Sequence, residues 1–130
     1  MTILQPAGWP RPKGFACGVS AEGTVVFVSG QIGWDEQGRF TATDVAGQVR
    51  QALRNVVTIL AEAGARPEHV ARMTWYVTDK REYLAAQREI GEAYREVMGR
   101  QFPAMSVVAV AALLEDAAKV EIEATAIVPR

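Results

Sequence analysis

The stretch Phe102-Pro-Ala-Met-Ser106, with the segments Val107–Leu114 and Val120–Ala126 that follow it, decides the fold of this chain. The first following segment is almost entirely apolar, and the second, VEIEATA, alternates apolar and polar residues. Alternation with a period of two is typical of a strand with one buried face, whereas a continuous apolar run is typical of a strand buried on both faces. We therefore predict that two paired strands end the chain, the second with Glu121 and Glu123 on its polar face.

The rest of the chain predicts two helices and further strands. Apolar residues at three- and four-residue steps follow Thr43 or Asp44, either of which can cap a helix that ends at Gly64. Asp79 caps a second helix, which ends at Gly99. The predicted strands are Ala16–Ser20, Thr24–Gly30, Ala71–Thr78, Ser106–Leu114 and Lys119–Val128. We expect the first two to form a hairpin, and the whole to be one α+β domain over residues 1–130, with residues 1–15 as an N-terminal arm.

Composition narrows the possible functions. The chain has 130 residues, of which 49% are hydrophobic and 22% charged, so it can build a sizeable core. Its formal net charge of −1 gives no general attraction to nucleic acid or to an anionic membrane, and no apolar run reaches the roughly 20 residues of a membrane-spanning helix. A single cysteine excludes an internal disulfide. We expect a cytoplasmic protein that binds neither nucleic acid nor membrane.

The motifs that would indicate a metal or a cofactor are incomplete. The one histidine, His69, has no cysteine or histidine at metal-ligand spacing. The segment Gly30-Gln-Ile-Gly33 lacks the third glycine and the following helix of a dinucleotide-binding loop. We therefore expect neither a metal nor a cofactor.

Two strands are apolar on both faces, which indicates a partner. Two helices can cover only one face of the sheet, yet Val25–Val28 and Val107–Leu114 do not alternate as half-solvated strands would. Since no other part of the chain remains to cover the second face, we predict that another copy covers it in a symmetric homo-oligomer.

Four segments resemble the Rid family, the reactive-intermediate deaminases also called YjgF-like proteins. They are Val28–Ile32, Gln51–Asn55 with Ala63-Gly64, Thr74–Asp79, and Phe102–Ala126. The resemblance implies a chorismate-mutase-like fold with a mixed six-stranded sheet, two helices on one face, and a homotrimer through the other. It also implies small-molecule pockets at the subunit interfaces. In the catalytic branch of the family these pockets hydrolyse 2-imino and 2-enamino acids to 2-keto acids and ammonia.

The resemblance also implies a set of site residues. Glu121 matches the family glutamate that positions the attacking water, so it is the predicted catalytic residue. Met105 stands where the catalytic branch has an arginine that holds the substrate carboxylate, and a thioether offers no hydrogen-bond donor. Met105 could line the pocket or simply fill the core. The other predicted substrate-binding residues are Phe15, Gly30, Gln31, Trp34 and Ala104.

Two functions from different classes remain open at this point. The first is hydrolysis of an imine, an enamine or a similar activated molecule, with poor use of 2-aminoacrylate and a preference for larger or uncharged substrates because Met105 cannot anchor a carboxylate. The second is a non-catalytic homotrimer that binds a small ligand. An endoribonuclease or translation inhibitor is less favoured, because the sequence has no basic stripe with interleaved aromatic residues.

Overall fold

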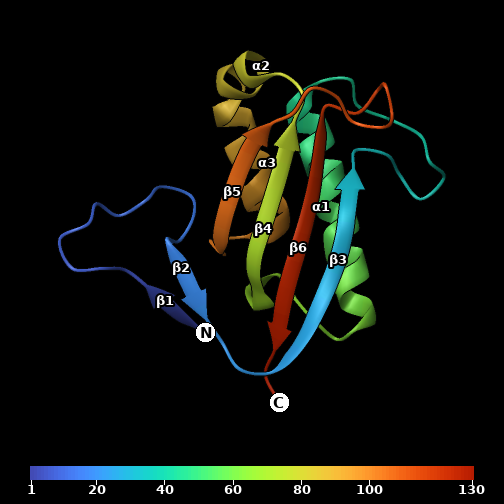
Figure 1. The fold of residues 1–130 in the computed structure, drawn as a ribbon. Helices are drawn as coiled ribbons and strands as arrows, with labels where there is room; N and C mark the ends of the chain where they lie inside the picture. The colour runs from blue at the N-terminus through green and yellow to red at the C-terminus, as the bar shows by residue number, and fades with distance from the viewer.

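The computed structural model describes residues 1–130 and confirms the α+β class (Figure 1). Its elements are β1 (Thr2–Leu4), β2 (Gly18–Ser20), β3 (Thr24–Ile32), α1 (Val45–Glu62), the 3₁₀ turn η1 (Pro67–His69), β4 (Val70–Val77), α2 (Lys80–Ala85), α3 (Gln87–Met98), β5 (Ala104–Ala109) and β6 (Val120–Val128). Four strands form a mixed sheet in the order β3-β6-β4-β5, in which only β4 and β5 run parallel. Because β4 lies between β5 and β6, the predicted pairing of the last two strands with each other is wrong. Helices α1 and α3 lie behind this sheet, and the face turned toward the viewer carries no helix (Figure 1).

Six strands are present, but they divide between two sheets. Strand β2 pairs with β1 rather than with β3, so the predicted hairpin between the second and third strands is wrong. The turn before β3 contains Gly23, whose φ is +148°. Its backbone lies against the end of β6, because an added Cβ would stand 2.1 Å from the carbonyl oxygen of Val128. The turn therefore leads the chain onto the end of β6, and β3 pairs with β6 instead.

The first helix follows its predicted pattern closely. The Asp44 carboxylate accepts a hydrogen bond from the backbone N–H of Gly47 at 3.1 Å, which satisfies one of the free donors of the first turn. The apolar stripe of α1 is completely buried against the sheet at Val49, Leu53 and Leu60. Burial of each of these side chains stabilises the fold by roughly 1.5–3 kcal/mol. The sequence thus predicted both the cap and the packed face of this helix.

The second predicted helix is divided into α2 and α3. Ala86 leaves helical geometry, with φ −105° and ψ 15°, and ends α2 while it begins α3. Alanine is a strong helix former, so nothing in the local sequence indicates this break. Tyr83 of α2 and Gln87 of α3, one on each side of the break, line one cavity.

The bare face of the sheet carries the polar side of β6. Val120 and Ile122 are fully buried toward the helices, whereas Glu121 and Glu123 are only partly buried on the opposite face, as the alternation predicted. Phe27 of β3 is 79% exposed and pairs with Thr125 on the same face. An aromatic ring this exposed fits the predicted covering of the face by another copy, which stays a prediction.

Candidate functional site: an aromatic pocket and a carboxylate cluster on opposite faces of the sheet

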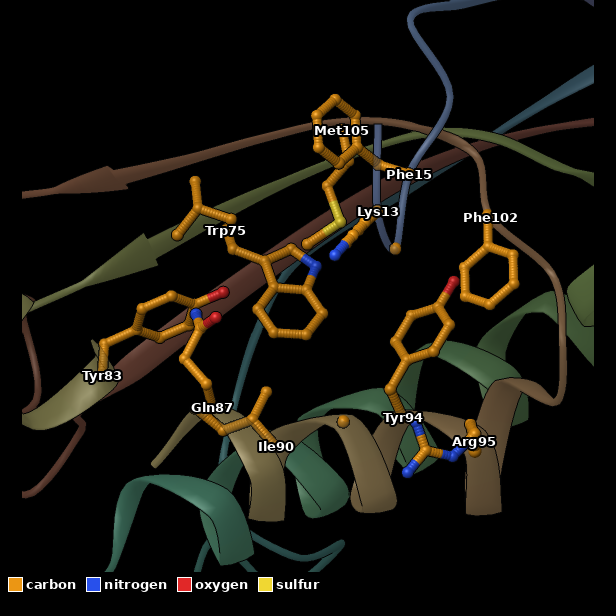
Figure 2. Close-up of a pocket in the computed structure, with 13 residues that line it drawn as sticks. Lys13, Phe15, Trp75, Tyr83, Gln87, Ile90, Tyr94, Arg95, Phe102 and Met105 are labelled. Atoms are coloured by element: carbon orange, nitrogen blue, oxygen red, sulfur yellow. The ribbon is translucent and has the colours of Figure 1, made fainter. Parts of the chain in front are cut away.

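A cavity of about 540 Å³ opens between the sheet and helices α2 and α3 (Figure 2). Its aromatic walls come from five separate segments of the chain: Phe15, Trp75, Tyr83, Tyr94 and Phe102. Met105 and Val107 of β5 add aliphatic surface to the same cavity. We call this cavity, as defined by these seven residues, the aromatic pocket.

Tyr94 is held in place in the wall of the aromatic pocket by contacts of both its ring and its hydroxyl. Its ring stacks on Phe102 with centroids 6.0 Å apart and lies 6.2 Å from the ring of Trp75. Its hydroxyl donates a hydrogen bond to the backbone carbonyl of Gln101, and burial raises the pKa of Tyr94 above that of a free tyrosine. The side chain is therefore neutral at ordinary pH and is held at both ends.

Polar groups reach the aromatic pocket at a few points. The indole N–H of Trp75 is buried without any hydrogen-bond partner. Lys13 and Arg95 also line the pocket, neither takes part in an ion pair, and no acidic side chain is among the lining residues. Gln87 contributes an amide with no side-chain hydrogen bond. The pocket thus combines apolar walls with unpaired donors and an excess of positive charge.

The predicted catalytic carboxylate lies on the other face of the sheet, directly over a glycine. A Cβ added to Gly30 would stand 2.3 Å from Oε2 and 2.6 Å from Cδ of Glu121, so the Glu121 side chain rests on the bare backbone of β3. The φ of Gly30 is not positive, so the requirement for glycine here is steric rather than conformational. The structure therefore brings two predicted site residues, Gly30 and Glu121, into contact.

Tyr76 of β4 joins the two glutamates. It pairs with Glu121 across the β4–β6 ladder, and its hydroxyl donates a hydrogen bond of 2.8 Å to Oε1 of Glu123. The pKa of Tyr76 is raised, chiefly because its proton serves this hydrogen bond and also because both carboxylates disfavour a phenolate. We call Gly30, Tyr76, Glu121 and Glu123 the carboxylate cluster. In it Glu123 has a bonding partner, while the Glu121 carboxylate has no side-chain hydrogen bond.

Gln31 and Trp34 lie in a third place. Both line a shallow, mostly polar hollow beside α1, together with Arg54 and Asn55. The Asn55 amide donates to the backbone carbonyl of Trp34 at 2.8 Å, which ties the loop to the helix. The Trp34 ring packs against Phe40, with centroids 6.0 Å apart. Trp34 therefore packs within its own loop, in a hollow separate from the aromatic pocket.

No three side chains of the histidine, cysteine, aspartate and glutamate type lie together in a way that could hold a metal ion. None of the helices has both the length and the apolar character needed to cross a membrane.

Comparison with known proteins gives the chain a family. A family model described as Endoribonuclease L-PSP matches residues 12–128. The chain is 38% identical over 105 residues to the 2-iminobutanoate/2-iminopropanoate deaminase of Salmonella typhimurium, with 81% of this chain and 80% of that protein covered. It also matches the crystal structure of a Rid-family protein of unknown function, YyfB from Yersinia pestis, with a TM-score of 0.86 and 28% identity over 98% of both chains. The chain belongs to the Rid family.

A second similar solved structure carries a ligand. Escherichia coli TdcF, crystallised with bound serine, is 35% identical to this chain, with a TM-score of 0.69 and 98% of both chains covered. The family assignment confirms the resemblance stated from the four sequence segments.

Within this Rid-family chain, the predicted site residues occupy three places. Phe15 and Met105 line the aromatic pocket, Gly30 and Glu121 meet on the opposite face of the sheet, and Gln31 with Trp34 lines the hollow beside α1. The separation follows from strand register. Met105 pairs with Met73, which is fully buried toward the helices, whereas Glu121 pairs with Tyr76 on the other face.

Ala104 has a structural position at the edge of the sheet. It pairs with Arg72 of β4, and it forms an isolated parallel bridge with Ala16, whose N–H donates to the carbonyl of Pro103 at 3.0 Å. These contacts hold the N-terminal segment beside β5, and they place Phe15 at the mouth of the aromatic pocket.

Most walls of the aromatic pocket were missed by sequence reasoning. Trp75, Phe102, Lys13 and Arg95 come from segments far apart in the chain, so no local pattern joins them. Tyr94 lies on α3, where an apolar position of a helix looks the same in the sequence whether it lines a pocket or fills the core. The one available signal was the density of aromatic residues on elements that were predicted to pack together.

Proposed function

We propose that this Rid-family chain hydrolyses the C=N bond of an imine, formed directly or from an enamine, at small-molecule pockets between the subunits of a homotrimer. The observation that carries this proposal is the Glu121 carboxylate, which rests on the backbone of Gly30 at the bare face of the sheet. The naming of the Salmonella relative as an imine deaminase supports the same chemistry. A cytoplasmic location, as expected from the sequence, is part of the proposal.

The chemistry needs a base beside the imine carbon. Water adds to the carbon, so that a C–O bond forms, and the Glu121 carboxylate accepts the proton that the water releases. That proton passes to the nitrogen, which gives a carbinolamine. The hydroxyl proton of the carbinolamine then moves through Glu121 to the nitrogen, the C–N bond breaks as the C=O bond forms, and the products are a carbonyl compound and ammonia. A carboxylate suits both steps because it can accept a proton and return it. Tyr76 pairs directly opposite Glu121 on β4, so it restricts the space that Glu121 can occupy.

The shared site follows from the two faces of the sheet. Glu121 points to the bare face, whereas the aromatic pocket with Phe15 and Met105 opens on the helix-covered face. A single subunit cannot bring its own Glu121 to its own aromatic pocket without breaking the ladder between β4 and β6. A neighbouring copy that packs on the bare face can supply the Glu121 instead. In a closed ring of three copies, each aromatic pocket receives one Glu121 from a neighbour.

Met105 limits the substrates of the proposed hydrolase. Its thioether lies in the aromatic pocket and offers no donor to a carboxylate. We therefore expect poor hydrolysis of 2-aminoacrylate and better hydrolysis of larger or uncharged imines, for which apolar contact replaces charge pairing.

The test is hydrolysis of freshly generated imines that range from small anionic to large neutral. The Glu121→Gln variant should lose about 10²–10⁴-fold of the turnover seen with the preferred class, which is the usual contribution of a positioned acid–base group. Glu123→Gln is the matched control, because it makes the same change on the same strand and face but at a carboxylate engaged with Tyr76. Equal turnover by wild type and Glu121→Gln would refute the proposed role.

One observation favours a second candidate. The only position at which the Rid resemblance expects a charged substrate anchor is occupied by Met105, so the chain could have kept a pocket and lost the reaction. In that case the protein is a non-catalytic trimer that binds a small ligand. The same panel separates the two candidates, since a binding trimer would turn over none of the imines while still binding at least one of them.

A further inference from the structure

The outer edge of β3 is long, apolar and unpaired. Strand β3 pairs with β6 on one side only, so it ends the main sheet. The part Thr24–Val28, TVVFV, contains no charged residue and no proline, although natural proteins commonly use both to protect the edge of a sheet. Val25 and Phe27 on this strand are 48% and 79% exposed. An edge of this kind is a template for the addition of a further strand.

Strands β1 and β2 form a sheet that is too small to be stable alone. Three residue pairs join the two strands, and each strand has one unpaired edge. Every residue of β1 is exposed, including the apolar Ile3 and Leu4. We call β1 and β2 together the N-terminal sheet. Because an isolated two-stranded sheet is at best marginally stable in water, the N-terminal sheet needs a further strand.

The β3 strand of the same chain does not supply that further strand. Figure 1 shows the N-terminal sheet beside the β5 side of the main sheet, whereas β3 forms the opposite edge. Only three residues, Ala21, Glu22 and Gly23, connect β2 to β3. Gly23 lies against the carbonyl oxygen of Val128, so the connection leads the chain to the end of β6 rather than back along β2. Short connecting loops of this kind favour the exchange of an element between copies.

The residues along the two unpaired edges match in kind. A three-residue hairpin connection would set Val19 of β2 opposite Val25 of β3, and an exchanged strand keeps the same register. Ile3 pairs with Val19 in the N-terminal sheet, and Val25 pairs with Ile127 in the main sheet. Joining the two sheets therefore aligns four apolar side chains in one row across the strands, which stabilises the pairing.

We propose that the N-terminal sheet of one copy adds to the unpaired edge of β3 in a neighbouring copy. The exchange completes a six-stranded sheet in the order β1-β2-β3-β6-β4-β5, whose first two strands come from another chain. The occupant of the edge is thus a second copy of this chain, and the exchange interlocks the subunits. This inference goes beyond the proposed function, because it concerns how the copies are joined and not the reaction that they catalyse.

Disulfide cross-linking between two different full-length chains tests the exchange directly. One chain carries Val19→Cys and the other carries Val25→Cys, both with Cys17→Ser and with tags of different mass. The two chains are unfolded, refolded together and oxidised. We expect a linked product that contains one chain of each kind, because opposite positions on paired strands lie within disulfide reach. A mixed product no more abundant than random pairing gives, or no linked product at all, would overturn the proposal.

A chain that carries both cysteines distinguishes exchange from a hairpin within one chain. With Val19→Cys and Val25→Cys together, we expect linked oligomers on a denaturing gel, whereas a monomer with an internal disulfide would overturn the exchange. The matched control is Ile3→Cys with Val19→Cys, because these positions pair within one chain and should give only the internally linked monomer. If the valine replacements lower the melting temperature, Ser20→Cys with Thr24→Cys provides a second pair at the next position of the same register.

The length of the connection provides a further test. A flexible insert of about four glycine and serine residues between Glu22 and Gly23 gives β2 enough chain to fold back onto its own β3. In the chain with both Val19→Cys and Val25→Cys, the insert should change the product from linked oligomers to internally linked monomers. Linkage that stays between chains in spite of the insert would overturn the role of the short connection in the exchange.

Discussion

Replacement of Gly30 by alanine tests whether the position of the Glu121 carboxylate matters. The added Cβ would stand 2.3 Å from Oε2, 2.6 Å from Cδ and 2.8 Å from Cγ of Glu121. Real Cβ atoms essentially never come within 3.0 Å of another heavy atom, and ordinary contact begins at 3.4 Å. Because Gly30 does not have a positive φ, the backbone accepts alanine and the Glu121 side chain must move instead.

The size of that movement sets the expected effect. To regain ordinary contact the carboxylate must retreat by about 1 Å, a displacement that can cost about 10²-fold in rate when it affects a reacting group. The effect on stability should be small, about 1 kcal/mol or less, because Glu121 is only partly buried and its side chain can rotate toward solvent. We therefore expect kcat/KM for the preferred imine to fall about 10²-fold at a nearly unchanged melting temperature.

The assay is steady-state hydrolysis of the preferred imine, with thermal unfolding measured on the same samples. The control is the same change in the Glu121→Gln background, where Gly30→Ala should cost little more, since residues that act as one unit are not additive. Full activity of Gly30→Ala would show that the carboxylate does not act from this position. An equal further loss in the Glu121→Gln background would show that the glycine acts by some other route.

Three further changes have definite expected outcomes. Met105→Arg should add hydrolysis of 2-aminoacrylate, measured as ammonia release, because a hydrogen bond from the guanidinium to the substrate carboxylate can contribute roughly 1.5–3 kcal/mol of binding free energy. No gain of this activity in a folded variant would contradict the placement of Met105 at the site. Gln48→Leu should lower the unfolding free energy in urea by about 3 kcal/mol, because the amide donates to the carbonyls of Ala42 and Ala117 and accepts from the N–H of Lys119 at 2.8–3.2 Å. Burial raises the pKa of Tyr94 above the ordinary 10.0, so above about pH 10 the folded chain keeps a proton that the unfolded chain releases, and the unfolding free energy should fall as the pH rises. Tyr94→Phe should make that fall less steep. An unchanged slope of unfolding free energy against pH would refute the role of Tyr94.

The parts of the fold that depend on local pattern could be predicted from the sequence. Asp44 caps α1 because a carboxylate before an apolar stripe satisfies free N–H groups at close range, and Glu121 faces away from the core because β6 alternates. The pairing of β2 with β1 could not be predicted, since β1 is an exposed strand of three residues, and such a strand carries no register information. The break at Ala86 was equally hidden, because alanine favours a continuous helix.

Some features of the candidate site, too, could be predicted from the sequence, and others could not. Glu121 and Gly30 were both expected at the site from the family resemblance, and their contact follows from the neighbouring positions of β3 and β6 in the sheet. The opposite orientation of Met105 was not predicted, because it depends on the register of β5 with β4. The unsatisfied N–H of Trp75 could not have been predicted at all, since it results from what the surrounding side chains fail to offer.

The most direct test of the account is recovery of activity in mixed trimers. Glu121→Gln supplies an intact aromatic pocket without the carboxylate, and Met105→Trp, which fills the pocket, supplies an intact Glu121. Each variant alone should be inactive, whereas unfolding and refolding the two together in equal amounts should restore about a quarter of the shared sites if each site takes one part from each of two subunits. Recovery near that level is the predicted result. No recovery from a mixture shown to exchange subunits would contradict a site shared between neighbouring copies.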